Sequence, residues 1–201
     1  MIDRTSPLQV IKIGGSLLPT NSNRSAFKNV EQWLACQTDS INVVIIGGGH
    51  SVDHLRRWQR QFNLTVKQAH LNALQVMSLN TNNFARSSCI STVIENWNAL
   101  TNISQQSSAN PTTIMFDCLS FIRDIEPTLV GTPLSLDWSC TSDSIAARIA
   151  QLLGADKLTL LKSRTSCSDD LRTLRYANYV DRSFPQMAAA IKSVTFVDCS
   201  P

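Results

Sequence analysis

Short apolar runs alternate along this chain with stretches whose apolar residues recur at helical spacing. Each run has the length of a buried strand, and each spaced stretch is typical of a helix that covers one face of a sheet. This alternation predicts an α/β fold, a three-layer αβα sandwich on a mostly parallel sheet, with residues 1–201 as a single domain. The runs that we interpret as strands are residues 10–13, 42–46, 112–116, 157–163 and 194–197.

The stretches between these runs predict the helices. Phe27, Val30, Trp33 and Leu34 share one helical face and indicate a helix over about 25–36. A later helix begins with Thr141 or Ser142 as its N-cap and ends at Gly154, a residue type typical of the position after a helix. The other expected helices cover about 51–61, about 67–86 and 184–191.

Two segments have weaker patterns. In the first we expect a strand within 90–94, a short helix at 95–100, a polar loop at 104–111 and an apolar segment at 119–122. The second, residues 164–182, is polar and predicts a loop with one short helix.

The first apolar run contains one lysine, Lys12, and ends in Gly14, Gly15 and Ser16. Glycine lets the backbone approach a ligand closely, and consecutive amide groups in such a turn form an anion-binding concavity. Alternate residues of a strand face the same side, so Lys12 extends toward this turn. The pattern therefore fits a phosphate site, and it equally fits a plain strand-to-helix turn. Neither the P-loop motif nor the dinucleotide-binding motif is present.

The second strand ends in three glycines, Gly47, Gly48 and Gly49. With the intervening helix, the first two strands form a βαβ unit, whose parallel strands end at the same edge of the sheet. Ligands of open α/β sheets bind at that edge. Two glycine turns that meet there favour a ligand site more strongly than either turn alone.

Composition and charge exclude several classes of partner. The net charge is +3, only 16% of residues are charged, and there is no run of Lys or Arg. Arg56, Arg57 and Arg60 lie together on a predicted helix and are interpreted as a solvated face, so we expect no nucleic-acid partner. The first 20 residues contain no signal-peptide core and no apolar run approaches 18 residues, so we expect no membrane association.

The six cysteines form no Cys-x-x-Cys pair and are interpreted as reduced thiols of a cytoplasmic protein. His50 and His54 have a spacing that zinc sites use, but no Glu follows the first histidine and no third ligand is evident. His70 lies within the predicted helix at 67–86, either as a packing residue or as a substrate contact. Trp138 has the same two interpretations, core residue or wall of a substrate site.

Considered together, these motifs resemble the amino acid kinase family, which includes carbamate kinase and uridylate kinase. The likeness extends over about residues 8–197 and is carried by residues 12–16, 47–49, 141–144 and 158–163. Within the family, the chain is most similar to small kinases that phosphorylate [5-(aminomethyl)furan-3-yl]methyl phosphate in methanofuran biosynthesis. The short length, the start of the helix at residue 141, the segment around residue 160 and the residues 180–185 support that likeness.

The resemblance implies a kinase that uses ATP and Mg²⁺. Lys12 would contact the transferred phosphoryl group, Asp143 would orient the active-site lysine and help to organise Mg²⁺, and Lys162 would act as a second cation. The implied phosphate and nucleotide contacts are Gly14, Gly15, Ser16, Gly47, Gly48, Gly49 and Ser163, and the candidate substrate contacts are His70, Trp138 and Ser142.

Two positions depart from the pattern of the family. The larger kinases usually have Thr-Asp where this chain has Lys162 and Ser163, so a carboxylate often associated with nucleotide and metal is missing. The small kinases tend to have Asp where this chain has Ser139. The second cation at Lys162 compensates for the first departure.

The expected reaction is transfer of the γ-phosphoryl group of ATP to a small phosphate or carboxylate substrate. Such an acceptor is deprotonated at pH 7 and needs no general base, which fits a sequence without a His–Asp pair or a carboxylate dyad. A phosphomonoester would give a diphosphate, and a carboxylate would give an acyl phosphate. A nucleotide- or anion-binding regulatory protein of the same fold is the alternative from another class. Because relatives of this fold are often oligomeric, we expect a homo-oligomer, a dimer or larger.

Overall fold

A computed structural model describes residues 6–19, 24–105 and 110–201 of the chain. The described strands form a six-stranded sheet in the order β3-β4-β2-β1-β5-β6. Every pairing is parallel, so the expected mostly parallel sheet is parallel throughout. The strands are β1 (Leu8–Ile13), β2 (Ile41–Ile46), β3 (Val93–Ile94), β4 (Thr112–Phe116), β5 (Lys157–Lys162) and β6 (Val194–Asp198).

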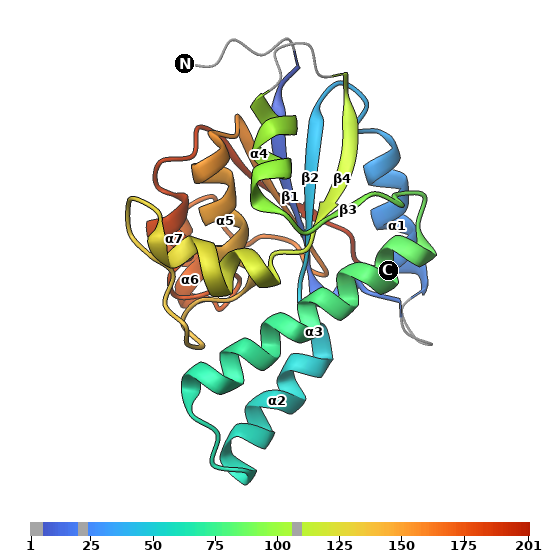
Figure 1. Ribbon diagram of the computed structural model, residues 1–201. Helices are drawn as coiled ribbons and strands as arrows, with labels where there is room; N and C mark the ends of the chain where they lie inside the picture. The colour runs from blue at the N-terminus through green and yellow to red at the C-terminus, as the bar shows by residue number, and fades with distance from the viewer. Residues whose placement is uncertain (1–5, 20–23, 106–109) are drawn as a thin grey trace.

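Helices cover both faces of this sheet, as the three-layer prediction requires. In Figure 1, α1 lies on one side of the strands, and α4, α5 and α7 lie on the other. The α-helices are α1 (Arg24–Ala35), α2 (Gly49–Gln61), α3 (Val66–Ser87), α4 (Trp97–Gln105), α5 (Ser142–Leu153), α6 (Leu171–Tyr176) and α7 (Phe184–Ala188). Shorter turns are the 3₁₀ helices Gly15–Leu17 and Glu126–Thr128 and the π-helix Phe121–Ile125.

The core consists of two apolar clusters, one on each face of the sheet. Alternate residues of β1 belong to different clusters: Val10 packs on the side of α5, and Ile11 packs on the side of α1. Lys12 is two residues from Val10 and therefore shares the α5 face. This register directs the lysine toward the start of α5.

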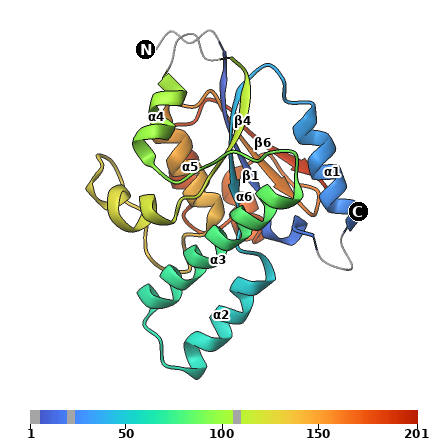
Figure 2. The same cartoon turned by 45° about the vertical axis from the view of Figure 1, so that its right-hand side comes forward.

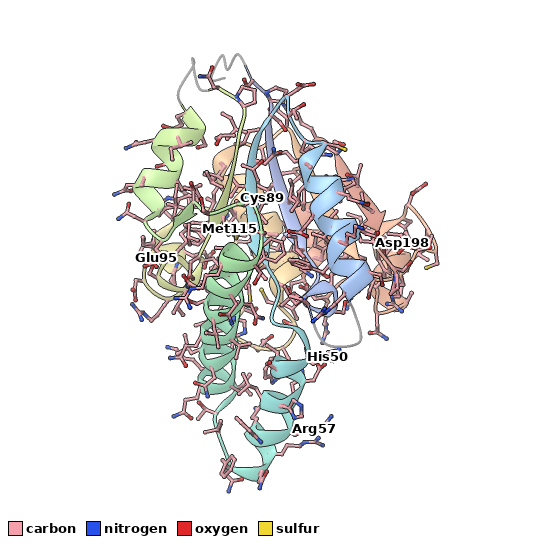
Figure 3. All side chains as sticks on the ribbon, turned by 90° about the vertical axis from the view of Figure 1, so that its right-hand side faces the viewer. His50, Arg57, Cys89, Glu95, Met115 and Asp198 are labelled. Carbon is pink, nitrogen blue, oxygen red and sulfur yellow. The ribbon has the colours of Figure 1, made fainter. Side chains whose placement is uncertain are left out.

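The second and third helices form a hairpin that extends from the carboxyl edge of the sheet (Figures 1 and 2). Thr65 begins α3 with a capping box, in which its side chain accepts from the Gln68 amide while Gln68 accepts from the Thr65 amide. Figure 3 shows His50 at the base of α2 and Arg57 farther along it. Arg57 is exposed, as the sequence predicted.

Most expected elements are present, with shifted ends. The last helix ends at Ala188 instead of residue 191, because the Ala189 and Ile191 amides donate to carbonyls three residues back and tighten the chain into turns. The helix expected at 95–100 continues to Gln105, into the segment predicted as a loop, of which residues 106–109 lie outside the described residues. The apolar segment at 119–122 leads into the π-helix.

None of the helices in the described part of the chain combines the length and apolar character needed to cross a membrane.

Candidate active site

One carboxylate and two lysines meet at the carboxyl edge of the sheet. Lys12 Nζ lies 2.7 Å from Asp143 Oδ1, and Lys162 Nζ lies 2.6 Å from Asp143 Oδ2. The contact of Lys162 with Asp143 is also a hydrogen bond. The contact of Lys12 with Asp143 is an ion pair whose angles are not those of a hydrogen bond. All three side chains are largely buried, with exposed fractions of 6% for Lys12 and Asp143 and 12% for Lys162.

The register of the sheet explains why both lysines reach the same carboxylate. Strand β1 pairs with β5 so that Lys12 is opposite Leu160. Lys162 is two residues farther along β5 and therefore faces the same side of the sheet, one step closer to its edge. Asp143 lies in the first turn of α5, where a carboxylate also interacts favourably with the helix dipole.

Burial and charge together set the ionisation of this cluster. Burial by itself favours the neutral form of Asp143, but the charges of Lys12 and Lys162 outweigh it and lower the pKa of Asp143 to about 2. Burial also lowers the pKa of Lys162 to about 8, even though Asp143 favours the charged lysine. At neutral pH the carboxylate is therefore ionised and Lys162 is protonated. With two basic groups for one acidic group, the cluster attracts anions.

The two glycine turns contact each other backbone to backbone. A Cβ on Gly15 would lie 2.0 Å from the Gly49 nitrogen, and a Cβ on Gly47 would lie 2.9 Å from the Gly15 nitrogen. Gly49 also has φ +62°, a conformation that favours glycine. Asn80 of α3 holds the second turn in place, since its side-chain amide donates to the carbonyls of Gly47 and Gly48.

Two of the backbone amides that were expected to donate to a ligand phosphate donate to other backbone carbonyls instead. The Gly14 amide donates to the Leu161 carbonyl at 2.9 Å, and the Gly47 amide donates to the Ile13 carbonyl at 2.9 Å. These bonds close the ends of the strands, so the prediction that both amides face a ligand phosphate is corrected. The amides of Gly15, Gly48 and Gly49 stay as candidate donors.

Two serines that were predicted to contact phosphate follow the ends of neighbouring strands and lie next to each other. Ser16, after β1, and Ser163, after β5, are joined by a hydrogen bond of 2.9 Å between their hydroxyl groups. This bond links the first glycine turn to the end of the strand that carries Lys162. Ser142 lies on the other side of the site, where its hydroxyl would be 3.1 Å from a Cβ on Gly47.

Asp181 caps α5, a role that the sequence interpretation had given to Thr141 or Ser142. One oxygen of Asp181 accepts from the amide and hydroxyl of Thr141 and from the amide of Ser144, and the other accepts from the Ser144 hydroxyl. Thr141 occupies the N-cap position, but its side chain donates instead of accepting. The same carboxylate accepts from the amides of Ser183 and Phe184. It therefore fixes the segment before α7 to the helix that carries Asp143.

Two adjoining cavities lie beside the cluster. The smaller, of about 170 Å³, is bounded by the second glycine turn, α2, α3 and the start of α5, and His70, Trp138 and Ser142 are among its lining residues. The larger, of about 690 Å³, is lined by Asp143 and Lys162 and by residues 178–182. Their shared wall consists of Arg56, Trp138 and Thr141.

Arg56 was interpreted from the sequence as part of a solvated face, and the structure gives it a second role. Its guanidinium lies 4.8 Å from the centre of the Trp138 ring, a cation–π distance, and it pairs with Asp53 at 3.2 Å. The Trp138 indole donates to Gln59 of α2 at 2.6 Å. Trp138 is half-buried, so it belongs to the wall of the cavities instead of the core.

The site brings together Lys12, Asp143, Lys162, both glycine turns, Ser142 and the two cavity residues His70 and Trp138. Sequence reasoning missed Asn80, the capping role of Asp181 and the position of Arg56. Asp181 had one signal, its place in the segment 180–185 that resembles the small kinases. Asn80 had none, because an asparagine in the middle of a helix is not distinctive.

Asp143 is the carboxylate that the sequence associates with Mg²⁺. Each of its oxygens lies 2.7 Å or less from an ammonium nitrogen, and Oδ1 has no hydrogen-bond partner among the described residues. A carboxylate oxygen has more than one acceptor position, so Asp143 could still contact a Mg²⁺ ion bound to the phosphates of ATP. Within residues 6–19, 24–105 and 110–201, no group of three or more His, Cys, Asp and Glu side chains is placed to hold a metal ion, and His50 and His54 belong to none. The described residues therefore contain no site built from three such ligands, and the expectation that Asp143 helps to organise Mg²⁺ stays a prediction.

The comparisons with known proteins agree with the fold and the motifs. Residues 7–164 match the Amino acid kinase family. This chain belongs to the amino acid kinase family. The match covers both glycine turns, Asp143 and Lys162, and it confirms the sequence-based expectation of a kinase.

Solved structures of other kinases share the fold of this amino acid kinase at low identity. A UMP kinase from Bacillus anthracis is 14% identical, with a TM-score of 0.60, covering 98% of this chain and 88% of that chain. A UMP kinase from Ureaplasma parvum is 14% identical, with a TM-score of 0.59 and coverages of 96% and 90%. A uridylate kinase from Archaeoglobus fulgidus is 15% identical, with a TM-score of 0.59 and coverages of 95% and 91%. A search of curated proteins finds no match.

The contact between the glycine turns yields a stability prediction. Gly15→Ala places a methyl group 2.0 Å from the Gly49 backbone, so one turn must move. We expect a loss of about 3 kcal/mol or more in the free energy of unfolding, measured by urea titration. Gly14→Ala, whose Cβ would meet the Leu161 carbonyl at 3.0 Å, is the graded comparison with a smaller loss. Equal stability of Gly15→Ala and the wild type would contradict the close packing of the turns.

Proposed function

We propose that this amino acid kinase transfers the γ-phosphoryl group of ATP to a small phosphomonoester and produces a diphosphate. The observation that carries the proposal is the buried cluster of Lys12, Asp143 and Lys162 beside two glycine turns. Two ammonium groups fixed on one carboxylate form a preorganised site for negative charge in a largely dry environment.

The larger cavity suits the nucleotide. Its volume of about 690 Å³ lies in the range of small-molecule sites, about 300–1,000 Å³. Its lining contains four basic side chains, Arg56, Lys162, Arg175 and Arg182. The two carboxylates of the same lining are engaged, Asp143 by lysines and Asp181 by the start of α5. Basic side chains in this lining therefore outnumber carboxylates by four to two, and the excess of positive charge favours the phosphates of ATP.

The smaller cavity suits the acceptor. It adjoins the larger cavity at Arg56, Trp138 and Thr141, so that molecules in the two cavities approach each other there. The turn residues Gly48 and Gly49 contribute to its polar wall, where their amides can donate to the acceptor phosphate.

The residues of the site act by position and charge. A phosphate oxygen of the acceptor attacks the γ-phosphorus, and the bond from that phosphorus to the bridging oxygen of ADP breaks as the new bond forms. The acceptor is already deprotonated, so no proton has to be removed. Because the transition state is loose and its charge lies on the phosphoryl oxygens, Lys12 and Lys162 stabilise it by donating to them. Asp143 positions both lysines and neutralises part of their mutual repulsion.

The size of the acceptor follows from the smaller cavity. A cavity of about 150 Å³ holds one benzene molecule, and this one measures about 170 Å³. One small ring with short substituents therefore fits. Together with the likeness of residues 141–147 and 158–163 to the small kinases of methanofuran biosynthesis, this supports an acceptor of that kind, a phosphomonoester on one small ring.

Removal of the Lys12 ammonium tests the role of the cluster. We expect Lys12→Ala to lower kcat by about 10²- to 10³-fold, because one stabilising donor of the transition state is lost. Nucleotide affinity, measured by calorimetry, should change little since Lys162 and the arginines stay. Lys192→Ala, which removes an exposed lysine paired with Asp156, is the matched control and should behave as the wild type. Full turnover by Lys12→Ala would refute the assignment.

The depressed pKa of Lys162 predicts a pH dependence. In the free protein, Lys162 loses its proton as the pH rises through about 8, and its positive charge is then missing when ATP binds. We expect kcat/KM for MgATP to fall about tenfold per pH unit above pH 8. Lys162→Arg should lack this alkaline limb, because arginine stays protonated. If kcat/KM of Lys162→Arg still decreases above pH 8, a group other than Lys162 causes the decrease.

An assay of the product distinguishes the acceptor classes. Incubation of the protein with MgATP and a panel of phosphomonoesters and small carboxylates should yield a diphosphate from at least one ester. Acyl phosphates react with hydroxylamine and diphosphates do not, so a hydroxylamine-reactive product would favour the carboxylate alternative. Binding of MgATP without turnover of any compound would favour a regulatory protein.

A further inference from the structure

The hairpin of α2 and α3 carries the excess positive charge of the chain. Of the 18 Lys and Arg residues of the protein, residues 49–87 contain five, and of the 15 Asp and Glu residues they contain one, Asp53. This leaves 13 basic and 14 acidic residues for the rest of the chain, which is therefore close to neutral. The hairpin is thus a basic extension of an almost neutral body.

The basic residues at the far end of the hairpin have no acidic partner. Arg57, Arg60 and Lys67 are exposed, and none of their side chains forms an ion pair or a hydrogen bond within residues 6–19, 24–105 and 110–201. The one carboxylate of the hairpin, Asp53, pairs with Arg56 at 3.2 Å. The end of the hairpin, residues 57–67, which we call the hairpin tip, therefore presents uncompensated positive charge to its surroundings.

Large apolar side chains are exposed at the same tip. Trp58 is 50% exposed, Phe62 is 61% exposed and Val66 is 43% exposed. Trp58 and Phe62 are four residues apart at the end of α2, and their rings meet edge to face with 6.4 Å between their centres. Neither ring lines the larger or the smaller cavity. Exposed apolar groups that lie together indicate an interaction surface, here one that is separate from the active site.

The shape of the hairpin makes this surface accessible. No other helix or strand lies beside the tip in the three views, and Figure 3 shows Arg57 on the outer part of the hairpin. Asn63, with φ 51°, turns the chain between the two helices, and the Leu64 amide closes the turn by donating to the Gln59 carbonyl at 3.0 Å. A convex tip of this kind can reach a flat surface without hindrance from the body of the protein.

We propose that the hairpin tip binds an anionic membrane surface. Trp and Phe side chains enter the boundary between lipid headgroups and acyl chains, while basic side chains interact with lipid phosphates. Trp58 and Phe62 supply the aromatic groups, and Arg57, Arg60 and Lys67 supply the basic groups. The sequence-based expectation of no membrane association rests on the absence of a spanning segment and of a signal-peptide core. A protein that lies on a membrane surface needs neither.

The charge of the tip disfavours a second copy of this chain as its partner. In a two-fold contact the same surface meets itself, so the cations of one tip would face those of the other and repel them. A layer of lipid phosphates provides a counter-charge for each basic side chain, and the acyl chains below provide an apolar environment for the two rings. An anionic lipid layer therefore satisfies both kinds of exposed group.

Sedimentation of the full chain with vesicles tests the proposal. We expect binding to vesicles of equimolar phosphatidylcholine and phosphatidylglycerol, no binding to phosphatidylcholine alone, and a loss of binding as the salt concentration is raised. Binding to neither kind of vesicle, or equal binding to both, would overturn the proposal. This result does not depend on the kinase reaction, so it is independent of the proposed function.

Two double variants of equal charge show whether the tip is responsible. Arg57→Gln with Arg60→Gln should weaken binding to the anionic vesicles by about 25-fold, since each basic residue near such a surface contributes about fivefold. Arg24→Gln with Lys28→Gln removes the same charge from exposed positions of α1 and should bind as the wild type does. An equal loss of affinity in both double variants would contradict a contact at the tip.

The indole of Trp58 reports whether the tip enters the lipid. Fluorescence should shift to shorter wavelength when anionic vesicles are added, and Trp58→Phe should keep vesicle binding but lose this shift. Trp58→Ala with Phe62→Ala should weaken binding by about 10- to 100-fold, because two buried rings are lost. Leu79→Ala, which changes a 60% exposed leucine of α3 outside the tip, should bind as the wild type does. A shift that persists in Trp58→Phe would overturn the proposal.

Three other results would assign the tip to a different partner and overturn the proposal. Binding to poly-L-glutamate without binding to vesicles would indicate an acidic protein. Binding to single-stranded DNA without binding to vesicles would indicate a nucleic acid. A smaller molecular mass of Trp58→Ala than of the wild type in analytical ultracentrifugation would indicate a contact between copies of this chain.

Discussion

The arrangement of this site depends on one carboxylate shared by two lysines. Asp143 pairs with Lys12 at 2.7 Å and with Lys162 at 2.6 Å, and all three groups are largely removed from water. Charges in such an environment are costly unless paired, so each group requires the others. Because the partners come from β1, α5 and β5, this one interaction fixes the helix start against two neighbouring strands. The same arrangement holds two ammonium groups at the place where we propose that the phosphoryl group binds.

The glycine turns impose the second constraint. The parallel βαβ unit places both turns at the same edge, where their backbones approach so closely that Gly15 has no room for a side chain. Several backbone amides and carbonyls are consumed in forming this contact. Gly14 and Gly47 donate across the strand ends, and Asn80 takes two of the carbonyls. The turns are thus a rigid part of the wall, with only some of their amides left for a ligand.

The distribution of charge in the site supports the proposal that its substrates are anionic. The larger cavity has four basic side chains in its lining, while its two carboxylates are bound by lysines or by the start of α5. The smaller cavity has apolar residues of α2, α3 and α5 in its wall, together with the glycine turn, His70, Ser142 and the paired Asp53 and Arg56. One chain therefore provides a basic cavity and a smaller, more apolar cavity that meet at Arg56, Trp138 and Thr141. This division supports the proposed pair of substrates, a charged donor nucleotide and a small acceptor with an apolar ring.

The sequence by itself determined the order of the elements, the parallel sheet, the two glycine turns, the helix that begins near Asp143 and the likeness to the family. These features depend on local periodicity and on residues close together in the chain. Only the tertiary structure decided that Asp181 caps α5, that the Gly14 and Gly47 amides are occupied, that Arg56 lies at a cavity wall and that His70 Nδ1 pairs with the Asp137 carbonyl. Each of these rests on a contact between separate elements, or on a turn paired with another strand. The physical reason is that such contacts follow from strand register and helix packing, which no short stretch of sequence contains.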